Sequence, residues 1–340
     1  MDIFVASSKK TPYEFGARPE LDFDSAAYLQ QWIFWCEANG NRVEWPEDSF
    51  YASIPLYQQK NIPMVGQGHG RSVLVSRGQP AIVVLVRAEG DRRFRKWEGF
   101  SLRPHTVGGQ TSGLYIQLQE PGAFINMWDI NEVEIGNFGR AGLLFENRPM
   151  NNDGIFTGAI DRCWIEGGIF CNWWGDSNTI KRSTITGPNC GIELTGIPGA
   201  RQTTVEDCNI TTSGGAIKTV GVEQLNLRNL QLEHPGYLGP YTGDTDSFVY
   251  VSGGRLVDID NCTVNPNNVP SGMTHNIAAS AITLDNDTYH AEIRHSDINK
   301  GRLYHVNAGP AVTKAYLRNT NTYYGQTLAV SGPITVEAAY

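Results

Sequence analysis

The phrase Ile259-Asp-Asn-Cys-Thr-Val264 is one copy of a six-residue pattern that decides the fold of this chain. The pattern runs apolar, polar, polar, small or apolar, exposed, apolar. It occurs at 130–135, 160–165, 180–185, 205–210, 227–232, 259–264 and 293–298, and more weakly at 317–322. Successive copies start 20 to 34 residues apart. A period of this length, with no helical spacing inside it, is typical of a solenoid of strands.

Each copy contains two short alternating runs that meet at a break in phase. Alternation with a period of two is typical of a half-buried strand. The break falls on the second polar residue, which is Asp207, Asn229, Asn261, His295 or Asn319 in five of the copies. These residue types tolerate the left-handed backbone conformation that a sharp turn needs. We therefore expect two strands that meet at a one-residue corner.

A third alternating run follows in most repeats. It is found at 190–195, 216–220, 248–252, 281–285 and 303–307. Three strands per turn, stacked in parallel, form a parallel β-helix whose neighbouring coils lie about 4.8 Å apart. The sequence therefore predicts an all-β protein with this architecture.

Three cysteines, Cys163, Cys208 and Cys262, occupy one position of the phrase, which Ser183 and Ser296 share in other copies. No CxxC or Cys/His spacing is present, so neither zinc binding nor a disulfide framework is indicated. We interpret the cysteines as a column of small buried side chains inside the coil.

One convincing helix is predicted, at residues 24–39. Asp24 or Ser25 is suited to begin it and Gly40 to end it. Its apolar residues fall on one face at helical spacing, so we expect it to cover the open end of the coil. The predicted organisation is one structural domain: an N-terminal entry with the capping helix at 1–60, the β-helix at 61–325 and a C-terminal cap at 326–340.

Composition excludes several classes of partner. The 340 residues, 40% of them apolar, can bury a large core in one elongated domain. A formal net charge of −8 argues against a nucleic acid or an anionic membrane as partner, because no basic stripe is present. No apolar run approaches transmembrane length, and no signal peptide is visible at the start. We expect a virion (tail) component or an extracellular protein, or else a trimmed chain.

The N-terminal quarter carries a series of short motifs. They are Phe15-Gly16-Ala17, an Asp-containing stretch with Asp22, Asp24 and Ser25, the helix, Trp45-Pro46 followed by Tyr51, and Gly66-Gln-Gly68. In this order they resemble the opening of the pectate-lyase-like β-helix superfamily, in the branch that includes phage tailspike depolymerases. Two departures stand out: 18–21 replaces the family's Gly-Asp-Gly spacer, and Asp48-Ser49 replaces its glycine after the proline.

The resemblance implies a single-stranded right-handed parallel β-helix with an N-terminal capping α-helix. It also implies a large carbohydrate as substrate and assembly as a homotrimer. It does not imply one reaction, because the superfamily contains hydrolases, lyases, epimerases and non-catalytic binders.

Alternation also predicts which side chains of the third strand point out of the coil. The first outward column is Phe170, Glu193, Lys218, Tyr250, Thr283 and His305. The second, two residues further along each strand, is Asn172, Thr195, Val220, Ser252, Asp285 and Asn307. An ordinary solvated face would be rich in Lys, Glu and Thr, whereas these columns mix aromatic, acidic, basic and imidazole groups. The mixture favours a site on this face.

Two repeats are lengthened just before the third strand, at 234–247 and 266–280. The first insertion contains Tyr237, Tyr241, Asp244 and Asp246. An earlier repeat ends its third strand with Trp173, Trp174 and Asp176. Long loops on a rigid scaffold usually carry binding residues, so we expect these segments to form a groove beside the outward columns.

Aromatic rings and carboxylates suit a sugar site, because rings stack on pyranoses and carboxylates accept hydroxyl hydrogen bonds. Hydrolysis needs two carboxyl groups about 5 to 9 Å apart. We predict Glu193 with Asp244 or Asp246 as the catalytic residues. The predicted substrate-binding residues are Trp173, Trp174, Asp176, Lys218, Tyr237, Tyr241, Tyr250, Asp285 and His305. Hydrolysis requires no cofactor and no metal here.

Two alternatives to hydrolysis of a bacterial surface polysaccharide stay open. A polysaccharide lyase acting on uronates would use Lys218, Tyr250 or His305 as its base, with calcium possible at Asp285 and Asp287. A carbohydrate-binding adhesin would use the same face without catalysis.

Overall fold

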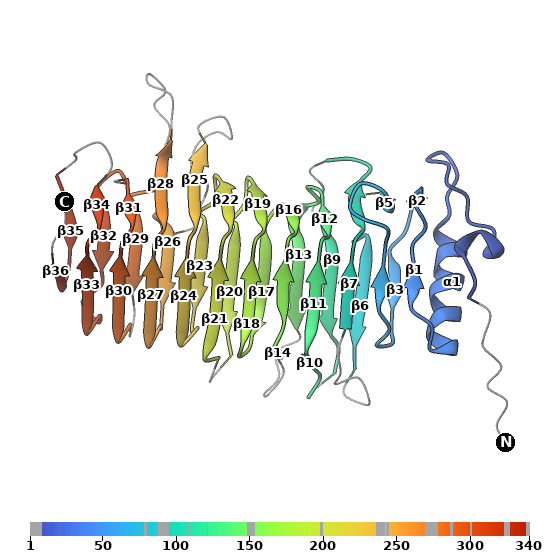
Figure 1. Cartoon of the computed structure of the whole chain (residues 1–340), viewed down its shortest axis with the longest axis horizontal. Helices are drawn as coiled ribbons and strands as arrows, with labels where there is room; N and C mark the ends of the chain where they lie inside the picture. Colours follow the sequence, from blue (N-terminus) through green and yellow to red (C-terminus); the bar gives the residue numbers. More distant parts are fainter. Residues whose placement is uncertain are drawn as a thin grey trace.

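The structure is a computed structural model, and its strands stack along one axis with a helix at the N-terminal end (Figure 1). It describes residues 9–77, 80–87, 95–107, 109, 111–120, 122–147, 154–197, 200–235, 242, 245–268, 278–285, 288–299, 301–322 and 327–337. Within these residues, every strand pairing between coils is parallel, and the strands form three long sheets. The predicted parallel β-helix is confirmed.

The strands of each coil belong to sheets 1, 2 and 3 in turn. Sheet 1 contains β1 (Val43–Glu44), β4 (Met64–Val65), β7 (Arg95–Glu98), β11 (Trp128–Asn131), β15 (Ala159–Asp161), β18 (Asn178–Lys181), β21 (Gln202–Glu206), β24 (Gln224–Arg228), β27 (Leu256–Asp260), β30 (His290–Arg294), β33 (Lys314–Arg318) and β36 (Ile334–Glu337). Sheet 2 contains β2 (Ser49–Ala52), β5 (Val73–Ser76), β8 (Ser101–Pro104), β12 (Glu134–Ile135), β16 (Trp164–Glu166), β19 (Thr184–Gly187), β22 (Asn209–Thr212), β25 (Gln231–Pro235), β28 (Thr263–Asn268), β31 (Asp297–Ile298) and β34 (Asn321–Thr322).

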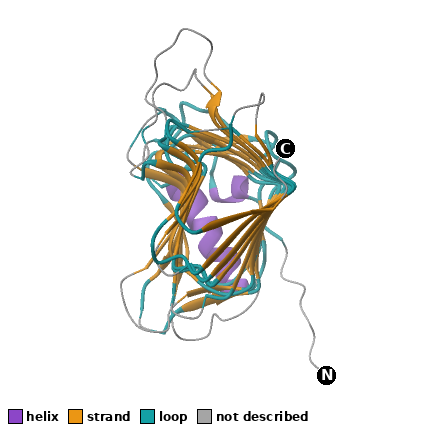
Figure 2. Ribbon diagram, turned by 90° about the vertical axis from the view of Figure 1, so that its left-hand side faces the viewer, coloured by secondary structure: helices purple, strands orange, loops and turns teal. Residues whose placement is uncertain are grey.

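Sheet 3 is the third layer of the coil. It contains β3 (Leu56–Gln58), β6 (Ile82–Val86), β9 (Thr111–Leu118), β13 (Gly139–Asn147), β17 (Ile169–Trp174), β20 (Ile192–Gly196), β23 (Ile217–Val220), β26 (Ser247–Ser252), β29 (Ser280–Asp285), β32 (Tyr304–Ala308) and β35 (Val330–Ser331). Two short strands, β10 (Phe124–Asn126) and β14 (Gly154–Phe156), pair beside this stack. The three layers enclose the core when viewed along the coil axis (Figure 2).

The chain turns from sheet 1 to sheet 2 at one left-handed residue in each of these coils, as predicted. Asp207, Asn229, Asn261, His295 and Asn319 all have left-handed φ angles, between 47° and 53°. The side chains also link successive coils: the Asn261 amide donates to Asn229 Oδ1 at 2.9 Å, and the Asn229 amide to Asp207 Oδ1 at 3.0 Å. The corner residues therefore tolerate an uncommon backbone conformation and connect neighbouring coils.

The core is built from columns of aliphatic side chains that stack from coil to coil. Ile180, Val205, Leu227, Ile259 and Ile293 are cross-strand partners in sheet 1, and each is at most 1% exposed. Burial of one such side chain stabilises the fold by about 1.5–3 kcal/mol.

The cysteine column lies inside the coil, which confirms its interpretation as a packing position. Cys163, Cys208 and Cys262 are buried, and burial raises the pKa of each thiol to about 12. Cys163 Sγ donates to the carbonyl oxygens of Ile130 and Asp161. Ser183, at the same position one coil on, donates likewise to the Lys181 carbonyl at 2.8 Å.

A single α-helix among the described residues, α1 (Ala26–Asn39), covers the N-terminal end of the coil (Figure 2). Gly40 ends it in the left-handed conformation, and the Asp24 carboxylate accepts from the Ala26 amide at the other end. Trp32 is buried and packs edge-to-face on Trp45 at 5.4 Å between ring centroids. A short 3-10 helix, η1 (Pro12–Phe15), precedes α1.

Strands of all three sheets precede residue 61, and β35 and β36 follow residue 325. The regular coil therefore extends beyond the 61–325 range that the sequence indicated. No helix in the described part of the chain is long and apolar enough to cross a membrane.

Candidate functional site

A polar row crosses the outer face of sheet 3. Glu193, Lys218, Tyr250, Thr283 and Asn307 are cross-strand partners in β20, β23, β26, β29 and β32. With a strand spacing of about 4.8 Å, the row is roughly 19 Å long and parallel to the coil axis. Glu193 and Lys218 form an ion pair at 2.9 Å. Because their neighbours along each strand are buried, the predicted outward orientation of Glu193, Lys218 and Tyr250 is confirmed.

A hollow of about 390 Å³ lies against this row. The residues that line it are Thr245, Asp246, Ser247, Tyr250, Ala279, Ser280, Thr283, Leu303, Tyr304 and Asn307. The structure thus brings together two predicted site residues, Asp246 and Tyr250. The crossings from β25 to β26 and from β28 to β29 carry the two predicted insertions. Tyr237, Tyr241 and Asp244 lie outside the described residues.

Tyr250 is coupled to the predicted site residue Asp285. Its hydroxyl donates to Asp285 Oδ2 at 3.1 Å. Burial, together with this carboxylate, raises the pKa of Tyr250 above its ordinary value. A tyrosine acts as a lyase base in its phenolate form, and a raised pKa leaves less phenolate at neutral pH. Tyr250 is therefore better suited to hydrogen bonding and stacking than to proton abstraction.

Asp246 is held at the hollow by two contacts. Its Oδ1 accepts from the Ala279 amide at 2.8 Å, and its Oδ2 pairs with Arg302 at 3.0 Å. Its side chain is still 61% exposed. Among the described residues that line the hollow, Asp246 is the one carboxylate. The geometry leaves its carboxylate accessible from outside the coil.

Glu193 lies far along the row from Asp246. It aligns with Tyr250 two strands away, and Asp246 precedes Tyr250 by four residues. Strand rise and spacing then give roughly 16 Å between the two Cα atoms. Within this arrangement Glu193 contacts Lys218 and not Asp246. Glycosidases hold their two carboxyl groups roughly 5 to 9.5 Å apart, and the catalytic pairing of Glu193 with Asp246 stays a prediction.

The expectation that Trp174 faces a ligand is wrong. The Trp174 ring is fully buried, and its Nε1 donates to Thr203 Oγ1 at 2.8 Å. The pairing of β17 with β20 shifts register between Cys171 and Trp174. An extra residue in a strand reverses the alternation beyond it, so Trp174 points into the coil.

The expectation that His305 faces outward is also wrong. His305 is fully buried, and its Nδ1 accepts from the Ala329 amide at 3.0 Å. Asn307, not His305, pairs with Thr283. The predicted register between β29 and β32 is therefore wrong by two residues. An error of two residues leaves the inward and outward alternation unchanged, so the alternation cannot reveal it. His305 instead lies where the chain enters sheet 3, level with the buried Ala281.

The two remaining nominated residues lie away from the hollow. Trp173 is half-buried at the end of β17. Asp176 follows that strand, and its Oδ1 accepts from the Gln202 amide at 2.9 Å. Its carboxylate thus supports the turn towards sheet 1.

Sequence reasoning missed two residues at the hollow. Tyr304 lines it, and Arg302 holds Asp246. The sequence does contain a signal for the correct register: the apolar pair Val306 and Ala308 matches the apolar pair Ile282 and Leu284 of the preceding coil. This match places Arg302 and Tyr304 beside the hollow.

Comparison with known proteins supports the fold. No protein-family model and no curated protein matches this sequence. Among solved structures, it is similar to the gp42 tailspike of Acinetobacter phage vb_AbaP_AS12, with a TM-score of 0.60 and 14% identity over 97% of this chain and 62% of the tailspike. It is also similar to the N-terminal fragment of gene product 12 of bacteriophage Phi29, with a TM-score of 0.54 and 14% identity over 92% of this chain and 66% of the fragment.

The chain thus spans less than two thirds of the length of either protein. At this identity the likeness establishes a shared β-helix fold, in agreement with the resemblance carried by the N-terminal motifs.

Proposed function

We propose that this protein binds a bacterial surface polysaccharide along the outer face of sheet 3. The observation that carries the proposal is the polar row from Glu193 to Asn307, which lies parallel to the coil axis and meets the hollow beside Tyr250. An extended polymer can lie along such a row and contact one side chain per coil. Tyr250 and Tyr304 offer ring faces and hydroxyls to sugars, and Asp246 accepts hydrogen bonds from them.

Hydrolysis is the reaction we propose for the bound chain, with Asp246 as one of the two carboxyl groups. Its support is the position of Asp246, exposed beside the hollow and fixed by Ala279 and Arg302. The raised pKa of Tyr250 argues against the lyase alternative at this position. No cofactor is needed for this chemistry.

Binding without cleavage is the second candidate. One observation favours it: the carboxylates of this face already contact protein groups, Glu193 with Lys218, Asp285 with Tyr250 and Asp246 with Arg302. An adhesin would use these polar groups to fix a sugar chain without any proton transfer.

Incubation with a panel of bacterial capsules and lipopolysaccharides separates these candidates. A hydrolase is expected to release shorter chains with new reducing ends and no near-ultraviolet absorbance, as determined by mass analysis of the products. Absorbing unsaturated ends would identify a lyase. Retention of an uncut polymer would identify an adhesin, and failure to bind any member would contradict the proposal.

We further propose that the protein acts as a homotrimer in a virion tail, outside the host cell. The support is the resemblance of the N-terminal motifs to the tailspike branch, together with the fold that the chain shares with a phage tailspike. Light scattering of the intact protein is expected to give three times the chain mass of 37.5 kDa. A monomer would contradict this assembly.

A further inference from the structure

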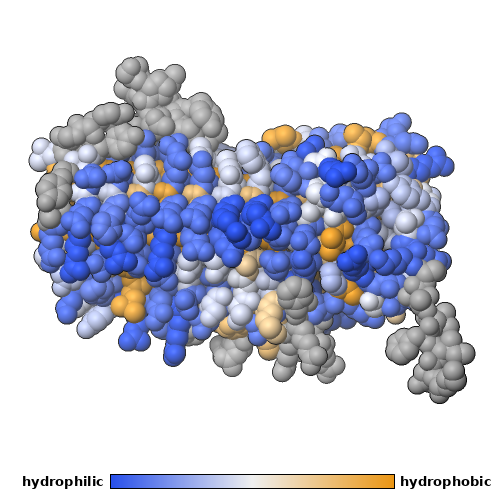
Figure 3. Space-filling model, in the orientation of Figure 1, coloured by the Kyte–Doolittle hydropathy of each residue, from blue (hydrophilic) through white to orange (hydrophobic). Residues whose placement is uncertain are grey.

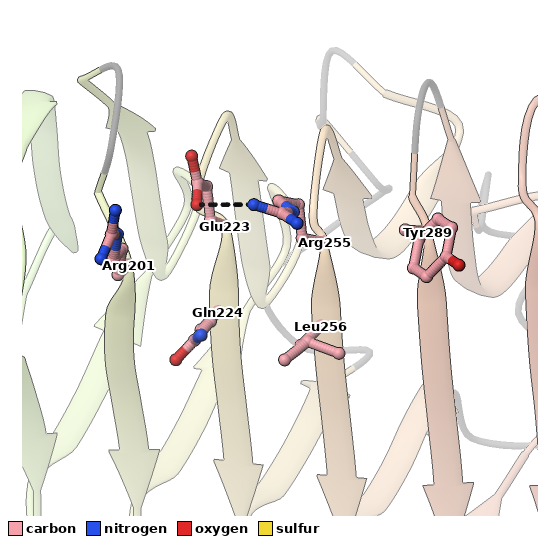
Figure 4. Close-up of a pocket in the computed structure, with 6 residues that line it drawn as sticks. All are labelled: Arg201, Glu223, Gln224, Arg255, Leu256 and Tyr289. Carbon is pink, nitrogen blue, oxygen red and sulfur yellow. Dashed lines mark ion pairs between the residues drawn. The ribbon is translucent and has the colours of Figure 1, made fainter.

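A second hollow, of about 370 Å³, lies on sheet 1, a different layer of the coil from sheet 3. Figure 4 shows the six residues that line it, at the starts of β21, β24, β27 and β30: Arg201, Glu223, Gln224, Arg255, Leu256 and Tyr289. Because Gln202, Gln224, Leu256 and His290 are cross-strand partners, the residues before them also form a row. This row, Arg201–Glu223–Arg255–Tyr289, spans three strand spacings, or roughly 14 Å.

Two guanidinium groups of the row are available to a ligand. Arg201 is exposed and forms no ion pair with a residue that the structure describes. Arg255 is 74% exposed, and its Nη1 lies 3.9 Å from Glu223 Oε2, at the outer limit of an ion pair. The row therefore carries an excess positive charge on a protein whose formal net charge is −8.

Three arginines of the neighbouring strands of sheet 1, Arg228, Arg294 and Arg318, pair with acids. Arg294 pairs with Asp258 at 3.1 Å and with Asp260 at 3.2 Å, and Arg318 pairs with Glu292 at 2.8 Å. Charges of this kind repeat from coil to coil, and a hydrophilic band runs along the molecule in Figure 3. The guanidinium groups of Arg201 and Arg255 are therefore less fully neutralised by acids than those of Arg294 and Arg318.

Apolar surface lies directly beside these charges. Tyr289 is 54% exposed and Leu256 is 49% exposed. An adjoining hollow of about 240 Å³ shares Gln224 and Leu256 and continues towards Asp258, Glu292 and Arg294. Its acids pair with arginines, Asp258 with Arg294 and Glu292 with Arg318, so the exposed cations lie in the first hollow, beside an aromatic ring and the Gln224 amide.

We propose that this hollow on sheet 1 binds a saccharide that carries a carboxylate, separately from the site on sheet 3. A guanidinium group binds a carboxylate through two parallel hydrogen bonds, while Tyr289 stacks on the apolar face of the pyranose. The Glu223 carboxylate would accept hydrogen bonds from the hydroxyls, and the Gln224 amide would accept or donate them. A protein partner fits less well, because the centre of a protein interface is depleted in charged residues, whereas three of the six lining residues are charged.

The test is saturation-transfer NMR on the intact protein with tetrasaccharides of galacturonate, mannuronate and glucuronate, and with neutral maltotetraose as comparison. At least one acidic tetrasaccharide is expected to bind and maltotetraose is not. Arg255→Ala is expected to weaken binding about tenfold or more, as for the loss of a charge-assisted hydrogen bond, and Tyr289→Ala to weaken it by a similar factor.

Arg162→Ala is the matched control. It removes an exposed arginine that pairs with Glu132, and neither residue lines either hollow. Binding is therefore expected to stay within about twofold of the original, since a remote charge acts only through screened electrostatics. Circular dichroism checks that each variant is folded.

Several results would overturn the proposal. These are no binding of any acidic tetrasaccharide, equal binding of maltotetraose, or binding that survives both Arg255→Ala and Tyr289→Ala but is lost in Tyr250→Ala, which would assign the ligand to sheet 3. A fall in the mass measured by light scattering for the folded Tyr289→Ala variant would identify the hollow as a contact between subunits instead.

Discussion

Replacement of Trp174 by alanine is expected to destabilise the protein by about 3–5 kcal/mol, the usual cost of removing a fully buried aromatic ring. The ring packs edge-to-face against Trp128 and Phe145, with 6.2 Å between centroids in both cases. The substitution also leaves Thr203 Oγ1 without the indole donor that it now has. The cavity would lie in the middle of the coil, where the surrounding strands have little freedom to close it.

Equilibrium urea unfolding measures this effect as a fall in the midpoint with little change in slope. Trp173→Ala is the matched control: the same substitution one residue earlier, at a half-buried side chain, is expected to cost clearly less. Trp174→Phe should recover most of the loss, because it keeps a ring in the cluster. A destabilisation below about 1 kcal/mol for Trp174→Ala would contradict the packing role, since that is less than burial of the ring contributes.

Asp246→Asn is expected to lower the rate of polysaccharide cleavage by about 10²- to 10⁴-fold, the usual contribution of a positioned acid or base. The amide keeps the shape of the side chain and can still accept the hydrogen bond from the Ala279 amide. It cannot carry the charge or exchange the proton that hydrolysis needs. Binding of the uncut polymer is expected to change much less than the rate.

The measurement is the rate of reducing-end formation at saturating polysaccharide, with affinity determined separately. Asp297→Asn removes an exposed carboxylate on sheet 2, away from the hollow, and serves as the control with an unchanged rate. If Asp246→Asn cleaves at the original rate, Asp246 is not a catalytic residue. If cleavage and affinity fall together by the same factor, its role is in binding.

The sequence was most informative where one residue type has a strong local requirement. Asn229 and Asn261 marked the corner because few other residues tolerate a left-handed backbone, and the structure has both at φ 52°. The buried positions of Cys163, Cys208 and Cys262 could be predicted from the same six-residue pattern. Glu193 and Lys218 could be placed on the outer face because their strands alternate without interruption.

The errors arose where alternation is interrupted or ambiguous. Trp174 follows a register shift that no pattern of period two records. His305 was misplaced by a slip of two residues, which alternation cannot detect. The hollow on sheet 1 is not predicted from the sequence, because Arg201 and Tyr289 precede their strands and lie outside the alternating runs.

The corner between sheets 1 and 2 restricts where this protein can accept insertions. From Glu132 to Asn319 it is a single left-handed residue in eight successive coils, so insertions are not tolerated there. The variation in repeat length, from 20 to 34 residues, falls on the other crossings, including those that enter β26 and β29 beside the hollow. Recombination between homologous genes could therefore exchange the segments at these crossings and leave the three sheets of the coil unchanged.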